Sequence, residues 1–165
     1  MKKSITALVL LTVGLIQAQA FKGKGDVKFD VGANLQEKGS GIRVSADFGL
    51  GENMSYGFAT SYLLSVSNDD LGNKPKFDDR IDAKVRFNAN LGNVFQFDEK
   101  MDIYPGLDLG LRNFGAHLGL RYFFTEGFGI FTEAGFPIAS YKPDAIGFDK
   151  LNNQFTFHIG ASFNL

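Results

Sequence analysis

Two histidines and three serines are the residues of this chain best suited to nucleophilic chemistry. His117 and His158 are its only histidines, and Ser45, Ser61 and Ser162 lie on the polar side of alternating segments. Covalent catalysis needs a nucleophile within hydrogen-bond reach of a base. No spacing singles out one serine, and no Gly-x-Ser-x-Gly motif is present. The sequence therefore predicts no catalytic residue and a protein that is not an enzyme.

Acidic residues are concentrated in the segment 68–79. Its carboxylates could attract Ca²⁺ or Mg²⁺, and they are Asp69, Asp70, Asp78 and Asp79. Their order does not match a calcium loop, which alternates its ligands and ends on a distant Glu. Lys74 and Lys76 offset part of the charge. We predict no metal site and no cofactor. The chain has no cysteine, which excludes a disulfide framework and lipid attachment at a cysteine.

Polar and apolar residues alternate along much of the chain. In residues 27–35, 42–48 and 81–87, apolar residues occupy every second position, and polar residues or glycine lie between them. Successive side chains of a strand point to opposite faces, so each segment is predicted to be a strand with one apolar and one polar face. Eight such strands are predicted, over residues 26–36, 41–50, 54–67, 80–91, 101–112, 116–124, 129–139 and 154–165.

The connections predict an antiparallel, up-and-down arrangement of these strands. Most are short and rich in turn-forming residues, whereas 68–79 and 140–153 are long. An even strand number leaves both termini on one side, usually the periplasmic one, and places the two long loops outside the cell. Residues 92–100 would then form a long periplasmic turn. Pro105 lies within a predicted strand and lacks a ladder donor, so we expect a bulge or an irregular strand start there.

The polar face carries positive and negative charges in equal numbers. The predicted interior network consists of Lys28, Asp30, Arg43, Asp47, Asp82, Lys84, Arg86, Asp108, Arg121 and Glu133. The same face carries further charges near the strand ends, at Asp26, Arg80, Asp102 and Arg112. An eight-stranded barrel is narrow enough to be filled by side chains, and enclosed charges need partners because an isolated buried charge is costly. Inward glycines leave room for long side chains. We predict a plugged, salt-bridged interior.

The start of the chain predicts export. Lys2 and Lys3 precede an apolar run over residues 5–16, and Ala18-Gln19-Ala20 fits a cleavage site. This pattern is typical of a secretory signal peptide over residues 1–20, removed after Ala20, and leaves one domain over 21–165. A permanent anchor is the alternative, but the run is too short to cross a bilayer comfortably. With 17 basic and 18 acidic residues and no basic stripe, nucleic acid is not an expected partner.

Alternation alone does not say which face lies inside the barrel. A soluble, lipocalin-like ligand-binding barrel would bury the apolar face and expose the charges. The glycine-rich polar face and the export signal favour lipid on the outside. Large aromatics near strand ends also favour a membrane girdle, and they are Tyr56, Phe124, Phe136, Phe155 and Phe163. The expected fold is therefore an all-β, eight-stranded antiparallel up-and-down transmembrane β-barrel.

The last predicted strand carries the sharpest resemblance to a known group. Phe157, Ile159, Ala161 and Phe163 alternate along it, and Glu133 stands at a polar interior position of the preceding strand. On these residues the chain resembles the small eight-stranded outer-membrane barrels of Gram-negative bacteria, such as OmpX and the barrel domain of OmpA. Leu165 departs from the terminal aromatic of that group. The resemblance implies a place in the cell outer membrane, with periplasmic chaperones and the outer-membrane insertion machinery as partners during assembly.

These observations together predict a non-enzymatic, monomeric protein surrounded by outer-membrane lipid. Its expected role is structural, or is surface display or adhesion through the loops 68–79 and 140–153. Two alternatives stay open within the membrane, a lipid A-modifying enzyme and a narrow pore for small solutes. The soluble ligand-binding barrel is the third alternative.

Overall fold

A computed structural model describes residues 19–67, 73–95, 98–142, 144 and 146–165. Of the predicted signal peptide, Gln19 and Ala20 are described, and the rest lies outside the described residues. Asp69 and Asp70 of the acidic segment also lie outside them. Within the described ranges, no helix has the length and apolar character required to cross a membrane.

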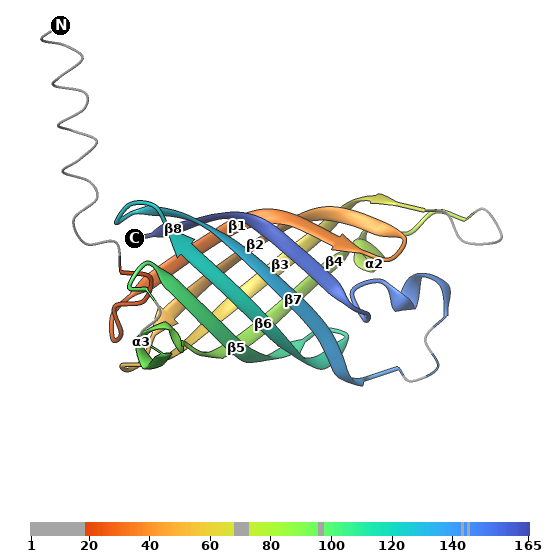
Figure 1. The fold of residues 1–165 in the computed structure, drawn as a ribbon. Helices are drawn as coiled ribbons and strands as arrows, with labels where there is room; N and C mark the ends of the chain where they lie inside the picture. Colours follow the sequence, from red (N-terminus) through yellow and green to blue (C-terminus); the bar gives the residue numbers. More distant parts are fainter. Residues whose placement is uncertain (1–18, 68–72, 96–97, 143, 145) are drawn as a thin grey trace, which may run out of the picture.

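Eight antiparallel strands form one closed barrel (Figure 1). The strands are β1 Val27–Gln36, β2 Gly39–Gly49, β3 Met54–Val66, β4 Ile81–Ala89, β5 Met101–Gly110, β6 Asn113–Phe123, β7 Phe128–Ser140 and β8 Thr156–Asn164. Each pairs with its sequence neighbours, and β1 pairs with β8 from Lys28↔Asn164 to Gln36↔Thr156 to close the ring. The prediction of an all-β, eight-stranded, up-and-down antiparallel barrel is confirmed.

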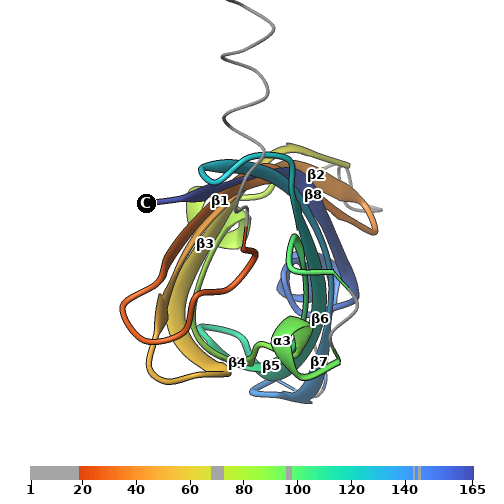
Figure 2. The ribbon, with the colours of Figure 1, turned by 60° about the vertical axis from the view of Figure 1, so that its left-hand side comes forward.

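Among the described residues, three short helical segments lie in the connections. They are α2 Phe77–Arg80, α3 Gly92–Phe95 and the 3-10 helix η1 Gly147–Lys150. In Figure 1, α3 lies at the end of the barrel where the C-terminus is found, and α2 lies at the opposite end. Figure 2 shows α3 at the rim of the mouth on the terminal side.

Two local predictions about the strands are wrong. The sixth strand begins at Asn113 rather than at residue 116, because Asn113 already pairs with Ser140 of β7. No register shift occurs at Pro105, which lies opposite Leu118 in a regular ladder. The ladder between β4 and β5 ends at Gly106, so the missing N–H of Pro105 interrupts no bond on that side. The register shifts are elsewhere, one of them between Phe114 and Gly115.

The outer wall of the barrel is apolar. The strands present exposed aliphatic or aromatic side chains on this wall, among them Ile42, Phe58, Val85, Leu109, Leu118, Ile130 and Ile159. Their neighbours along the strand point inward and are polar residues or glycine, apart from Ala59 and Phe131, so the barrel is apolar outside and largely polar inside. Closing the sheet places one face of every strand in the enclosed lumen, which explains why this division holds around the whole ring.

Aromatic side chains gather toward the two ends of the wall. At the terminal end, ring pairs join Phe29 to Phe163, Phe124 to Phe128, and Phe48 to Tyr56, with centroids 5.5–6.5 Å apart. At the opposite end, Tyr62 contacts Phe77 of α2 with centroids 5.5 Å apart. Aromatic rings at both ends of an apolar band are the usual arrangement where a barrel meets the two membrane interfaces.

The segment before β1 packs at the terminal end of the barrel. Phe21 is buried there, and its carbonyl accepts a hydrogen bond from Asn93 Nδ2 at 3.1 Å. Ala20 is also buried beside Phe123, and its N–H donates to the carbonyl of Glu99. Apolar side chains of the N-terminal segment and of β6 are therefore buried at this end of the barrel, and Phe21 and Phe123 are the ones that cleavage after Ala20 would leave.

Candidate functional site: the charged barrel interior

The polar residues of the candidate site point into the lumen because they occupy alternate positions on six strands. β1 contributes Lys28 and Asp30, β2 contributes Arg43 and Asp47, and β4 contributes Asp82, Lys84 and Arg86, while β5, β6 and β7 supply Asp108, Arg121 and Glu133. All of these are buried except Lys84, whose side chain is 19% exposed. Inside a closed barrel such charges have little access to bulk water, so their partners decide their cost.

Six of the ten residues form a continuous row of alternating charge across the lumen. In order along the row they are Asp30, Arg121, Asp47, Arg86, Glu133 and Arg43. Arg121 Nη2 lies 2.7 Å from Asp30 Oδ2, and the same guanidinium also donates to Asp47. Three cations and three carboxylates therefore neutralise one another within a single connected cluster.

Glu133 connects two arginines of this row. Its carboxylate accepts from Arg86 Nη2 at 2.6 Å and lies 2.8 Å from Arg43 Nη2. Arg86 also lies 3.4 Å from Asp47 Oδ1. Glu133 is thus a counter-charge that Arg43 and Arg86 share. Its loss would leave Arg86 with Asp47 alone and would remove the ion pair described for Arg43.

The remaining four residues form smaller groups at different depths. Lys28 Nζ lies 2.6 Å from Asp26 Oδ2 and 5.1 Å from the centre of the Phe123 ring, near the terminal end. Lys84 Nζ lies 3.8 Å from Asp82 Oδ2, which is an ion pair without a hydrogen bond. The carboxylate of Asp108 contacts a histidine ring rather than a lysine or arginine.

The two histidines have different surroundings. His117 Nδ1 lies 3.0 Å from Asp108 Oδ2, and its Nε2 lies 2.8 Å from both Asn88 Oδ1 and Arg86 Nη2. His158 is buried, and its Nδ1 has no protein partner. Within the described ranges, neither histidine is hydrogen-bonded to a serine, so no nucleophile is placed beside a base there.

The three serines named above lie at two different places in the lumen. Ser162 Oγ donates to Asp30 Oδ1 at 2.6 Å, and Ser45 Oγ lies 3.4 Å from Asp30 Oδ2. Ser61 lines a cavity in the other half of the lumen. Two serines therefore complete the hydrogen bonding of Asp30, the carboxylate at one end of the charged row.

Tyr104 is a central residue of the interior that charge-based selection missed. It is fully buried, and its ring centre lies 3.9 Å from the Arg121 guanidinium carbon and 5.8 Å from that of Arg86. Gly119 faces this ring, and a Cβ at residue 119 would overlap it. The alternation of β5 already pointed Tyr104 inward, beside Asp102 and Asp108, and this was the available signal.

The charges at the strand ends do not join the central row. Arg80 ends α2, and Arg112 Nη2 donates to the carbonyl of Asp78 at 2.5 Å, so both lie at the rim. Asp102 is buried near the terminal end, where Asn90 Nδ2 and the Gly92 N–H donate to it. The polar face therefore divides into a central network and contacts at the rim. The alternating sequence pattern does not distinguish between these two groups of charges.

Residues 11–165 match the family described as "Family of unknown function (DUF6646)". The chain belongs to the DUF6646 family. A search of the curated proteins found no match for this DUF6646 chain.

Two solved structures have the same fold as this DUF6646 barrel. The N-terminal β-barrel domain of Pseudomonas aeruginosa OprF has a TM-score of 0.61 at 12% identity and covers 87% of this chain and 100% of that one. A barrel from the de novo design of transmembrane β-barrels has a TM-score of 0.57 at 9% identity, covering 87% and 98%. At these identities the likeness establishes the eight-stranded barrel architecture.

Proposed function

We propose that this DUF6646 protein is a non-enzymatic integral barrel of the cell outer membrane. The observation that carries the proposal is the distribution of residues about the wall, which is apolar outside and ionic inside. A soluble barrel gains stability by the reverse arrangement, with apolar residues in the core and charges in water. An apolar band with aromatic rings toward both ends is suited to acyl chains and interfaces.

The lumen supports a closed barrel rather than a pore. The charged row crosses the interior, with Tyr104 packed against two of its arginines and Phe21 and Phe123 buried toward the terminal end. Ions moving along the axis would have to break several buried ion pairs, which is costly. The proposed role is therefore structural, or is surface display or adhesion through the loops 68–79 and 140–153. Proposed partners are outer-membrane lipid, periplasmic chaperones and the insertion machinery, and the protein is a monomer.

Heat-modifiable gel migration tests residence in the membrane. The protein should be found in the outer-membrane fraction, with its N-terminus at Phe21 after removal of the signal peptide. Unboiled samples should migrate differently from boiled ones because a folded barrel resists detergent. Recovery of a stable native protein in plain buffer without detergent would refute the proposal.

Planar-bilayer conductance separates the closed barrel from a narrow pore. The purified protein should give no steady open current, and a steady current would favour the small-solute pore instead.

Lipid A mass spectra separate the structural role from lipid-modifying activity. The spectra of cells with and without the protein should be identical. If they differ, and His117→Ala or His158→Ala abolishes the difference, the protein is an enzyme and the non-enzymatic proposal is wrong.

A further inference from the structure

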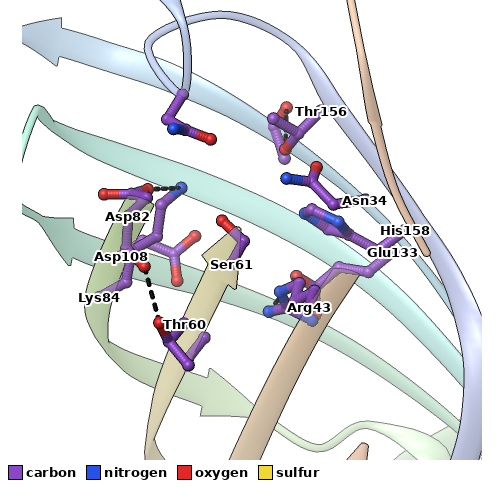
Figure 3. Close-up of a pocket in the computed structure, with 13 residues that line it drawn as sticks. Asn34, Arg43, Thr60, Ser61, Asp82, Lys84, Asp108, Glu133, Thr156 and His158 are labelled. Carbon is purple, nitrogen blue, oxygen red and sulfur yellow. Dashed lines mark hydrogen bonds and ion pairs between the residues drawn. The ribbon is translucent and has the colours of Figure 1, made fainter. Parts of the chain in front are cut away.

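A small polar cavity lies in the half of the lumen away from the chain termini, next to the charged row (Figure 3). Its lining comes from β1, β2, β3, β4, β5, β7 and β8, together with Asn152 from the segment before β8. The centres of water molecules have about 20 Å³ of free volume in this cavity. One buried water needs about 10–15 Å³ by this measure, so there is room for one or two.

The cavity is lined by buried polar atoms that have no protein partner. These atoms are Asn34 Nδ2 and Oδ1, Arg43 Nη1, Asp82 Oδ1, Asp108 Oδ1 and His158 Nδ1. Asn34 is fully buried, and both of its amide atoms are unpaired. Leaving a buried donor or acceptor unsatisfied costs about 1–3 kcal/mol each. Such a concentration around one cavity indicates a bound molecule that completes the bonding.

The unpaired groups form two walls of different chemistry. Asn34, Arg43 and His158 come from the neighbouring strands β1, β2 and β8, and Asn34 and His158 are directly paired in register. Asp82 and Asp108 come from β4 and β5, with Lys84 beside Asp82. Figure 3 shows the two groups on opposite sides, with Ser61 of β3 between them.

A ligand that bridges these walls must both donate and accept hydrogen bonds. The carboxylate oxygens of Asp82 and Asp108 only accept, whereas Arg43 Nη1 only donates. Water meets both requirements and has the right size. Since a buried water makes about three hydrogen bonds, two waters can satisfy all six unpaired atoms.

Protein groups flank the cavity on both sides along the barrel axis. The ion pairs of Glu133 with Arg43 and Arg86 separate it from the deeper lumen. At the loop end, the buried residue Asn152 makes two hydrogen bonds. Its N–H donates to Gln36 Oε1 at 2.9 Å, and its carbonyl accepts from Asn113 Nδ2 at 2.9 Å. The charged row therefore lies between the cavity and the terminal end, and the loop end is the side from which a bound water would enter.

We propose that this cavity is a binding site for one or two ordered waters that bridge the Asn34–Arg43–His158 wall to the Asp82–Asp108 wall. The site is a solvated dead end, and its size excludes sugars, amino acids and larger solutes. It does not depend on what the loops display, so the display role could fail while the water site stands.

Water–protein NMR on the folded barrel in neutral detergent tests the site directly. The side-chain amide of Asn34 should show cross-peaks to long-lived water in the unsubstituted protein, and their absence would overturn the proposal. Ammonium chloride and sodium chloride serve as cation probes at constant ionic strength. Cross-peaks that persist unchanged support water, whereas their loss on addition of either cation would replace water with a bound cation.

The sign of one stability change provides a second test. If waters bridge Asn34, Asn34→Leu removes their partner and should lower the melting temperature by about 2–6 °C. If the cavity is dry, the same change removes an unsatisfied amide and should raise the melting temperature, which would overturn the proposal. Asn90→Leu is the matched control, because Asn90 is bonded directly to Ser55 and Asp102 and must lose stability in either case.

Discussion

At the scale of single residues, the interior is held by partners rather than by individual charges. A buried ion pair contributes little net stability compared with a well-packed apolar pair, yet removing one partner is strongly destabilising. Glu133 illustrates this asymmetry, because its carboxylate lies beside both Arg43 and Arg86. The cost of a substitution here therefore depends on how many opposite charges it leaves unpaired.

Glu133→Ala should lower the free energy of unfolding by about 3–5 kcal/mol, because two buried guanidinium groups lose a counter-charge. The measurement is unfolding of the barrel in detergent, followed by the shift from fast to slow gel migration with temperature. Thr132→Ala, on the adjacent outward position, should change stability by no more than about 0.5 kcal/mol. Equal melting temperatures for both variants would refute the placement of Glu133 in the network.

Gly119→Ala should cost about 1–3 kcal/mol through overpacking. A Cβ at residue 119 overlaps the ring of Tyr104, which is fully buried against Arg121 and has no free space to occupy. Gly51→Ala is the control, since nothing lies within 4 Å of a Cβ at that position. Thermal unfolding of the two variants under the same conditions compares them, and an unchanged Gly119→Ala protein would contradict the packing described for Tyr104.

At the scale of elements, the hairpin between β1 and β2 contains a local conflict between sequence and backbone. Gln36 pairs with Gly39, so Glu37 and Lys38 form the turn, and Lys38 has a φ of 60°. This left-handed conformation costs about 1–2 kcal/mol in a residue with a Cβ. The closure of the ring determines the strand ends, and the turn adopts the backbone that joins them.

Lys38→Gly should therefore raise the free energy of unfolding by about 0.5–1 kcal/mol, because glycine adopts positive φ without the Cβ penalty. Lys38→Ala removes the same charge but keeps the strain, and it should show no gain. Melting temperatures of the three proteins decide the matter. A gain of the same size in Lys38→Ala would assign the effect to charge instead of backbone conformation.

At the scale of the whole molecule, the apolar wall and the ionic lumen both follow from closing one alternating sheet into a barrel. The exterior needs no charge if acyl chains surround it, and the lumen needs balanced charge because it is enclosed. The molecule thus has an apolar outer wall, buried apolar residues at the terminal end and a small polar cavity at the loop end. This arrangement is unsuited to conduction along the axis.

Val85→Lys tests the orientation of the whole wall. Val85 is exposed at the centre of β4, and a lysine there should cost about 2–4 kcal/mol if that position faces the bilayer midplane. Folding into lipid vesicles, titrated with urea, measures the difference. Ile146→Lys, at an exposed position of the loop end, should fold as the unsubstituted protein does. Equal folding of Val85→Lys would show that water rather than lipid contacts the wall.

Alternation along the chain was enough to predict the strands and the different chemistry of their two faces. A period of two leaves no ambiguity about which residues share a face, so the eight strands and the inward positions follow directly from alternation. The prediction was wrong at Asn113, because residues typical of turns already belong to β6 there. It was also wrong at Pro105, because the ladder between β4 and β5 ends at Gly106 and the missing N–H of Pro105 interrupts no hydrogen bond on that side. Local composition does not report where a neighbouring strand ends.

Which face is enclosed and which charges pair depend on how the strands close into a barrel. Alternation is the same whether the charged face is concave or convex, and closure of β1 on β8 places it inside. Arg121 pairs with Asp30, 91 residues away, although several carboxylates share the same face. Partner choice depends on the register and stagger of all eight strands together, and this is a property of the closed ring.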